Sequence, residues 1–248
     1  MLYLEHPTKN LLLISSSTIY GHGYLDHAES AIRDLLGRIQ RVVFLPFALY
    51  DREAYSAKAR NRFQRMDVSL QSVHAAADPR RVIEEAEAIF IGGGNTFRLL
   101  KALYDYDLLE PIRSRVAAGV PFVGSSAGSI VACPTLKTTK DMPVVQPPSF
   151  DALRLVNFQI SPHYLDPDPT STHMGETQEE RIMQYLEEND LPVVGLREST
   201  MLRITNGSVI LRGGTTARIF QRGTLPVEVQ PETRLTSGDA RAGDTRLP

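Results

Sequence analysis

Short apolar runs separated by helical patterns constrain the fold of this chain more than any other feature. The runs cover residues 11–14, 41–45, 88–91 and 121–123. Because they do not alternate apolar with polar residues, they are typical of parallel strands that are covered on both faces. Between the runs, apolar residues recur every three or four positions, as in the amphipathic helices expected over residues 25–39 and 55–66. This alternation predicts an α/β fold with a mostly parallel sheet and helices on both faces.

The C-terminal half carries weaker but readable signals. Prolines crowd residues 134–148 and indicate a long loop, which a brief strand at 158–160 follows. A capping box beginning at Thr177 predicts a helix over 177–188. The Asn206-Gly207 pair is typical of a two-residue turn between antiparallel strands, so we expect an antiparallel hairpin to complete the sheet.

Length and composition favour one domain. The chain has 248 residues, of which 42% are apolar, and this is enough for a sizeable core. We predict a single α/β domain over residues 1–230. Residues 231–248 contain no aromatic and few apolar residues, so we expect a disordered tail there.

Charge and cysteine content exclude several classes of partner. The formal net charge is -2 and both signs are interspersed, which argues against nucleic acid and anionic membranes. The N-terminal residues lack the pattern of a signal peptide, and no apolar run approaches the ~18 residues of a membrane span. The single cysteine, Cys133, excludes an internal disulfide. We therefore expect a cytoplasmic protein, and the sequence leaves open whether it forms a homodimer.

A G-x-S-x-G sequence, residues 124–128, lies between the apolar run 121–123 and a helical pattern. Such a turn between a strand and a helix exposes its central side chain above the sheet edge, and the flanking glycines permit the sharp reversal. Ser126 is therefore the candidate nucleophile. Cys133 is a rival because thiols are stronger nucleophiles, but its position indicates a small buried residue instead.

A serine nucleophile needs a base, a carboxylate that orients the base, and donors for the oxyanion. His163 follows the short strand 158–160, which places it at the same sheet edge as Ser126, although many loop histidines have no catalytic role. Asp141 and Glu176 lie on loops that flank His163, and the sequence does not choose between them. Either could equally be an ordinary loop carboxylate.

A glycine-rich turn at residues 92–95 follows the run 88–91 and precedes a helix. Its backbone N–H groups, together with that of Ala127, would suit an oxyanion site. The alternative is a phosphate-binding turn, but the G-x-x-x-x-G-K-[ST] motif is absent and G-x-G-x-x-G does not fit.

Several separated motifs in order make residues 11–220 resemble the peptidase E family of α-aspartyl dipeptidases. They are GGGNTF (92–97), GSSAG (124–128), ACPT (132–135), TT-DMP (138–143), PH (162–163) and GET (175–177) followed by Arg181. The resemblance implies a fold similar to class I glutamine amidotransferases, with serine in place of their elbow cysteine. It also implies hydrolysis of dipeptides with N-terminal aspartate, without metal or cofactor. The site residues that it implies are Ser126 as nucleophile, His163 as base, Asp141 as third member with Glu176 as rival, and Gly94 and Ala127 as oxyanion donors.

Two positions depart from this family. Ser125 stands where members often have tryptophan, and Gln178 stands where an arginine commonly follows GET and would suit the substrate's carboxylate. Some other cation must then hold that group, because a charge-recognising site rejects analogues that leave its partner unpaired. The candidate substrate-binding residues are Asn95 and Gln178, with Arg181, His173 and Arg98 as candidate cations in that order.

Two further functions fit the same residues. A cyanophycinase resembles this family and cleaves β-aspartyl-arginine units, whereas a non-catalytic small-molecule binding protein would retain the turn without turnover. The sequence favours a serine dipeptidase that acts on a small peptide, neither on nucleic acid nor at a membrane.

Overall fold

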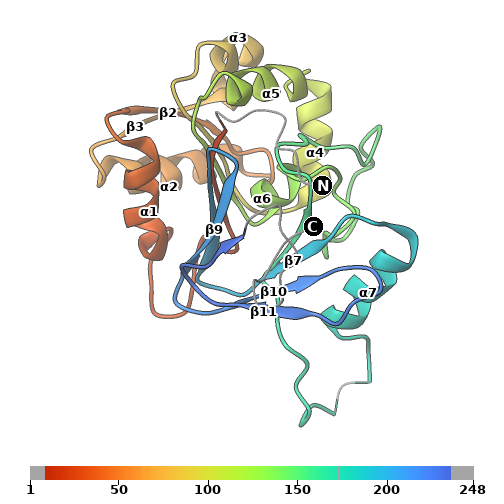
Figure 1. The fold of residues 1–248 in the computed structure, drawn as a ribbon. Coiled ribbons are helices and arrows are strands. Elements are labelled where there is room, and N and C mark those ends of the chain that lie inside the picture. Colours follow the sequence, from red (N-terminus) through yellow and green to blue (C-terminus); the bar gives the residue numbers. More distant parts are fainter. Residues whose placement is uncertain (1–8, 173, 236–248) are drawn as a thin grey trace.

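The computed structural model describes residues 9–172 and 174–235. Within them, eight strands form a large sheet in the order β12-β9-β8-β1-β5-β4-β2-β3. Their bounds are β1 (Asn10–Ile14), β2 (Arg41–Leu45), β3 (Ser69–Ser72), β4 (Ile89–Ile91), β5 (Phe122–Ser125), β8 (Thr200–Thr205), β9 (Ser208–Gly213) and β12 (Arg234–Leu235). Strands β1 to β5 pair in parallel, whereas β8, β9 and β12 are antiparallel. The predicted parallel sheet and C-terminal hairpin are confirmed (Figure 1).

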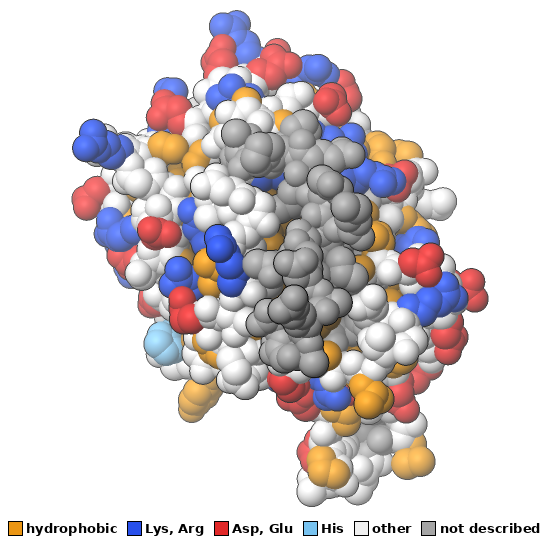
Figure 2. Space-filling model, viewed as in Figure 1, with side chains coloured by type: hydrophobic (Ala, Val, Ile, Leu, Met, Phe, Trp, Pro, Cys, Tyr) orange, Lys and Arg blue, Asp and Glu red, His pale blue; other side chains and the backbone are white. Residues whose placement is uncertain are grey.

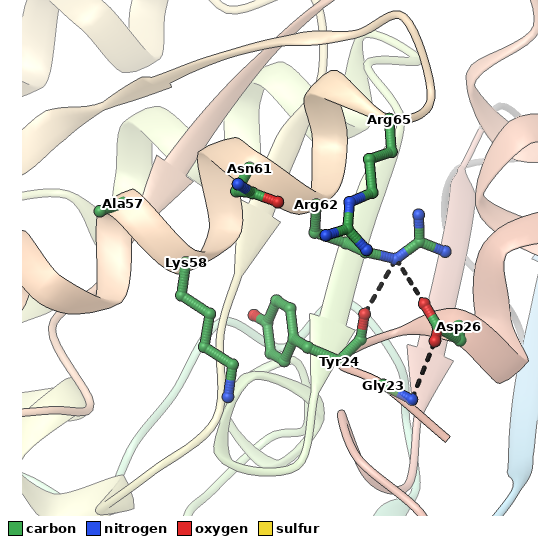
Figure 3. Close-up of a pocket in the computed structure, with 8 residues that line it drawn as sticks. All are labelled: Gly23, Tyr24, Asp26, Ala57, Lys58, Asn61, Arg62 and Arg65. Atoms are coloured by element: carbon green, nitrogen blue, oxygen red, sulfur yellow. Dashed lines mark hydrogen bonds and ion pairs between the residues drawn. The ribbon is translucent and has the colours of Figure 1, made fainter. Parts of the chain in front are cut away.

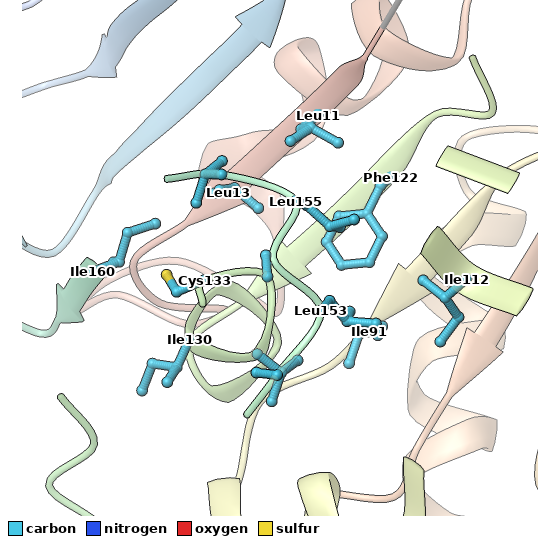
Figure 4. Packing of buried hydrophobic residues seen from close by; sticks show 14 of the residues in the cluster. Leu11, Leu13, Ile91, Ile112, Phe122, Ile130, Cys133, Leu153, Leu155 and Ile160 are labelled. Atoms are coloured by element: carbon cyan, nitrogen blue, oxygen red, sulfur yellow. The ribbon is translucent and has the colours of Figure 1, made fainter. Parts of the chain in front are cut away.

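Helices cover both faces of this sheet. The first face carries α1 (Glu29–Leu36) and α2 (Arg52–Gln64), and the second carries α3 (Pro79–Glu84), α4 (Thr96–Asp105), α5 (Leu109–Ala117) and α6 (Ala127–Val131). Two single-turn helices, η1 (Asp26–Ala28) and η2 (Val73–Ala75), complete the set within this part of the described chain. Successive residues of β1 divide between the faces, since Leu12 packs with the α1 and α2 side and Leu11 with the other. Figure 4 shows part of the apolar cluster on the second face, which includes Leu11, Phe122 and Ile112.

A second, four-stranded sheet has the order β11-β10-β7-β6. Its members are β6 (Gln159–Pro162), β7 (Val193–Leu196), β10 (Ala217–Phe220) and β11 (Val227–Val229), and α7 (Gln178–Glu188) packs against it. We expected all strands to complete one sheet. The structure separates them because β8 pairs with the free edge of β1, so β7 pairs with β6 on one side and with β10 on the other. In Figure 1 this sheet and α7 lie together below the large sheet.

The C-terminal residues differ in part from the predicted disordered tail. Arg234 and Leu235 pair with Ile210 and Val209 of β9, and the Leu235 side chain is buried in the core. A single leucine with room against β9 is enough to add a short edge strand, which composition alone does not reveal. Residues 236–248 lie outside the described residues.

Arg62 of α2 anchors the segment that leaves β1. Its side chain is 6% exposed and donates to the Tyr24 carbonyl at 2.9 Å, with carboxylate oxygens of Asp26 and Glu29 at 3.1 and 2.6 Å. Figure 3 shows Arg62 reaching Tyr24 and Asp26 across a pocket between α2 and that segment. The loop after β1 is therefore fixed by ion pairs as well as by apolar packing.

The visible surface agrees with the interspersed charges of the sequence. Figure 2 shows basic and acidic side chains alternating over the described part of this face, with apolar side chains scattered singly. Among the described residues, no helix has the length and apolar character to cross a bilayer.

Candidate active site

Ser126 occupies the turn between β5 and α6, as the G-x-S-x-G pattern predicts. Its φ and ψ are 52° and -111°, a strained backbone for a residue with a side chain. The Ser126 N–H donates to the Ile14 carbonyl of β1 at 2.9 Å. A Cβ atom at Gly128 would lie 2.1 Å from the Ile91 carbonyl oxygen, so only glycine lets α6 approach β4 here.

The structure brings His163 to Ser126. The distance between Ser126 Oγ and His163 Nε2 is 2.9 Å. His163 directly follows β6 and also has a positive φ, 53°. Its N–H donates to Ser15 Oγ at 2.9 Å, and the Ser15 hydroxyl donates to the Leu196 carbonyl at 2.8 Å. Strands of both sheets therefore fix the position of the imidazole.

The carboxylate beside the imidazole belongs to Glu198, which we did not predict. Glu198 Oε1 lies 3.3 Å from His163 Nδ1. Strands β6 and β7 are parallel neighbours with Pro162 opposite Leu196, so residues that follow them meet at one edge. The sequence pattern could have predicted this position, because Glu198 follows the apolar run 191–196 just as His163 follows the strand 158–160.

Asp141 contacts the start of α4 and its own loop. Its Oδ2 accepts hydrogen bonds from the backbone N–H of Thr96 at 2.7 Å, from Thr96 Oγ1 at 2.6 Å and from Thr139 Oγ1 at 3.1 Å. These bonds attach the loop that carries Asp141 to the first turn of α4. The structure therefore places the Asp141 carboxylate at the start of α4, and not beside the His163 ring.

Glu176 also contacts residues other than His163. Its carboxylate accepts from Gln184 Nε2 at 2.9 Å and lies 3.6 Å from Arg181 Nε. Both members of that ion pair are more than half exposed, at 54% and 55%. Neither sequence candidate for the third member is the carboxylate that contacts the imidazole, because the pairing of β6 with β7 brings Glu198 there instead.

The glycine-rich turn after β4 lies against Ser126. A Cβ atom at Gly93 would be 3.0 Å from Ser126 Cβ, and Gly94 has a φ of 134° that favours glycine. Ala127 is the first residue of α6, so its N–H has no intrahelical acceptor. The glycine-rich turn and the first residue of α6 therefore both adjoin Ser126 at one end of the parallel strands.

Both polar atoms of the Asn95 side chain form hydrogen bonds within the fold. As N-cap of α4, its Oδ1 accepts from the Arg98 N–H at 3.0 Å, while its Nδ2 donates to the Met142 carbonyl at 2.8 Å. Each of these atoms has one further hydrogen-bonding position, so the bonds fix the side chain without excluding the predicted role as a substrate ligand.

The residues predicted to bind the substrate's carboxylate already have other contacts in the described structure. Arg181 faces Glu176, and the Arg98 guanidinium lies 5.8 Å from the centre of the Tyr50 ring. His173 lies outside the described residues. Gln178 accepts hydrogen bonds from the Leu165 N–H and from Lys140 Nζ, both at 3.1 Å. Lys140, which we did not predict, contacts the backbone of His163, since its amine lies 3.1 Å from the His163 carbonyl oxygen.

Cys133 is buried in the apolar cluster of the second face. In Figure 4 its sulfur points among Leu13, Ile130 and Ile160. Burial raises the pKa of this thiol far above its ordinary value, so the reactive thiolate is disfavoured. The structure supports Ser126 over the rival nucleophile.

Arg197 ties the turn that carries Glu198 to its surroundings. Its guanidinium bonds both carboxylate oxygens of Asp166 at 2.7 and 2.8 Å and both of Glu228 at 2.9 Å. Hydrogen bonds from Arg197 hold the pKa of both carboxyls below their ordinary values. Glu198 therefore lies in a turn that is fixed on either side of β7.

Comparisons with known proteins agree with this geometry. Residues 11–212 match the family model described as peptidase family S51. The chain is 50% identical over 220 residues to peptidase E of Streptomyces coelicolor, covering 89% of this chain and 90% of that protein. It is 46% identical over 231 residues to a Drosophila melanogaster protein named "Probable alpha-aspartyl dipeptidase", covering 92% and 96%. The crystal structure of a peptidase from an acI-B1 actinobacterium shares the fold, with a TM-score of 0.69, 15% identity and coverage of 95% and 100%.

Proposed function

We propose that this chain, which belongs to peptidase family S51, is a serine dipeptidase that hydrolyses dipeptides with N-terminal aspartate through an acyl-enzyme. The observation that carries the proposal is the 2.9 Å contact between Ser126 Oγ and His163 Nε2 at a strained strand–helix turn. A serine in hydrogen-bond reach of an imidazole, which a carboxylate contacts in turn, is the arrangement that acyl transfer requires.

In the first half-reaction, Ser126 Oγ attacks the carbonyl carbon of the peptide bond and its proton passes to His163 Nε2. Glu198, at 3.3 Å from Nδ1, stabilises the resulting imidazolium and holds the ring in place. The N–H groups of Gly94 and Ala127 donate to the developing oxyanion, and each such donor contributes about 3 kcal/mol in the transition state.

The imidazolium then gives its proton to the departing amine as the C–N bond breaks, which leaves an aspartyl ester on Ser126. Water gives a proton to His163 and attacks the ester carbonyl. Collapse of the second tetrahedral intermediate releases aspartate and returns the proton to Ser126. Ser126, His163 and Glu198 come from one chain, so this chemistry does not require a second copy. A cytoplasmic location belongs to the same proposal, since the single cysteine is a buried thiol.

Replacing the nucleophile tests the proposal directly. We expect Ser126→Ala to lower kcat/KM for Asp-Leu by at least ~10⁴-fold, because the acyl-enzyme can no longer form. Thermal melting should show the fold intact, and Ser69→Ala, at an exposed position of β3, is a matched control that should retain full activity. Undiminished turnover by Ser126→Ala would refute the assignment.

A comparison of Asp-Leu with β-Asp-Arg as substrates separates the alternative functions. Turnover of β-Asp-Arg in preference to Asp-Leu would indicate a cyanophycinase-like peptidase. Binding of Asp-Leu without turnover, together with no labelling of Ser126 by a fluorophosphonate, would indicate a binding protein that retains the turn.

A further inference from the structure

We propose that Lys140 is the residue that selects an acidic substrate, because its ammonium group binds the side-chain carboxylate of the N-terminal aspartate. This inference rests on the proposed function and names the specificity-determining cation of the same site. Lys140 lies in a loop and belongs to no sequence motif that predicts a binding role. Its contacts in the structure indicate the role.

The hydrogen bonds of Lys140 all go to uncharged acceptors. Its Nζ donates to the Pro162 carbonyl at 2.7 Å, to the His163 carbonyl at 3.1 Å and to Gln178 Oε1 at 3.1 Å. All three acceptors are uncharged, so they orient the amine without neutralising it. Part of the residue remains exposed, which lets a carboxylate approach. An oriented ammonium of this kind attracts an anion more strongly than a fully solvated one.

The amine also contacts the residue that carries the imidazole. It bonds the backbone of His163, whose ring contacts Ser126. In an aspartyl residue, only Cα and Cβ separate the carbonyl carbon from the side-chain carboxylate. The carboxylate must therefore lie within a few ångströms of the reacting bond. The adjacent residue, Asp141, fastens the same loop to the start of α4. One short loop therefore contacts both the base and the glycine-rich turn.

The other cations are less suited. Arg181 already faces the Glu176 carboxylate at 3.6 Å, and Arg98 stacks on Tyr50. The resemblance led us to expect arginine at position 178, where this chain has glutamine. Because the Gln178 side chain accepts from Lys140, the positive charge lies at the neighbouring position instead. Lys140, Gln178 and Arg181 line a common cavity of about 90 Å³.

The ionisation of Lys140 supplies a second observable. Partial burial lowers its pKa to about 8, and the positive charge of Arg181 acts in the same direction while Asp141 opposes it. The ammonium is therefore present at neutral pH and is lost as the pH rises through about 8. His163 is the other titratable residue in contact with the amine, through its backbone oxygen.

The test compares Asp-Leu with Asn-Leu, which has the same shape but no charge. We expect the wild-type ratio of kcat/KM values to favour Asp-Leu, and Lys140→Met to lower that ratio by about 10-fold, a value between those for exposed and for buried charge pairs. Lys101→Met removes the same charge from an ion pair with Asp105 on α4 and should leave the ratio unchanged. An unchanged ratio in Lys140→Met, or a collapse in Arg181→Met alone, would overturn the proposal.

The pH dependence distinguishes a charge from a structural role. The wild-type ratio should fall above about pH 8, whereas Lys140→Arg, which stays charged, should keep it constant. Taking the ratio cancels the titration of the α-amino group that both dipeptides share. A constant ratio in the wild type up to pH 10 would overturn the proposal.

Binding in the Ser126→Ala background separates failure of this inference from failure of the proposed function. Calorimetry should show Asp-Leu binding more tightly than Asn-Leu, with the difference lost in Ser126→Ala/Lys140→Met. If the wild type shows no turnover but this difference is found, only the proposed function fails. If turnover occurs but no difference is found, Lys140 is not the selecting residue.

Discussion

At the scale of single residues, Ser126 and His163 both adopt positive φ angles, 52° and 53°, although neither is glycine. Such conformations cost about 1–3 kcal/mol each and persist only where surrounding contacts enforce them. Here the Ile14 carbonyl fixes Ser126 and the Ser15 hydroxyl fixes His163, both from the end of β1. Buried groups at the end of β1 therefore fix the backbones of the two strained residues that face each other.

Glu198 is the residue whose replacement best tests the third position. We expect Glu198→Gln to lower kcat for Asp-Leu by about 10²- to 10³-fold, because an amide cannot stabilise the imidazolium and favours the wrong ring tautomer. KM should change little, since Glu198 contacts the base and not the substrate. Steady-state kinetics at pH 7 measure both constants.

Glu176→Gln is the matched control, because this glutamate faces Arg181 on the surface. Its kcat should remain within about twofold of the wild type. A larger loss in Glu176→Gln than in Glu198→Gln would contradict the assignment made from the geometry.

At the scale of secondary-structure elements, local signals were sufficient where one segment determines its own structure. The Asp51 side chain caps α2 by accepting from Ala54, and Thr177 and Glu180 form the predicted capping box of α7. The Asn206-Gly207 turn joins β8 to β9 as expected. These elements follow from contacts between residues a few positions apart, which a sequence displays directly.

The elements that the sequence did not resolve depend on distant pairing. An apolar run such as 191–196 has the same pattern whether it joins the large sheet or a second one. Only the pairing of β7 with β6 brings Glu198 to His163, and only the fold places Lys140 against Gln178. Asp141 and Glu176 were plausible because they are near His163 in sequence, but their loops lead to other partners.

The glycine-rich turn and α4 form one unit with Asp141, and this predicts the effect of removing its carboxylate. Asp141→Ala deletes three hydrogen bonds to Thr96 and Thr139, including the bond to a backbone N–H in the first turn of α4. We expect kcat to fall roughly tenfold because the glycine-rich turn next to Ser126, which we propose as an oxyanion site, loosens. Hydrogen exchange at Gly94 to Thr96 should accelerate in parallel.

Asp105→Ala, at the other end of α4, is the control and should leave both measurements unchanged, because its partner is Lys101. A loss of activity in Asp141→Ala without faster exchange in the turn would indicate that Asp141 acts in another way.

At the scale of the whole molecule, the site joins the two sheets. Ser126 comes from the large sheet after β5, whereas His163 and Glu198 follow β6 and β7 of the small sheet. Ser15 links them, since its hydroxyl donates to the Leu196 carbonyl of β7 and accepts from the N–H of His163. Activity therefore requires both sheets to be in place, and loss of the small sheet's packing should abolish turnover before the large sheet unfolds.

The Arg197 cluster predicts how stability depends on acid. Arg197 lowers the pKa of Asp166 and Glu228 in the folded protein, so their contribution is present above the ordinary carboxyl values of about 4 and is lost as the pH falls through the lowered ones. Arg197→Met should lower the free energy of unfolding at pH 7 by about 1–2 kcal/mol, a value reduced by the partial exposure of both carboxylates.

The difference in Tm between wild type and Arg197→Met, measured by calorimetry, should then shrink between pH 5 and about pH 3, because protonated carboxyls no longer attract the guanidinium. Arg222→Met removes an ion pair with the highly exposed Asp190 and should show little change at any pH. A Tm difference for Arg197→Met that stays constant down to pH 3 would mean that Arg197 stabilises the small sheet by packing on Tyr164, 5.5 Å from its ring centre, and not by its charge.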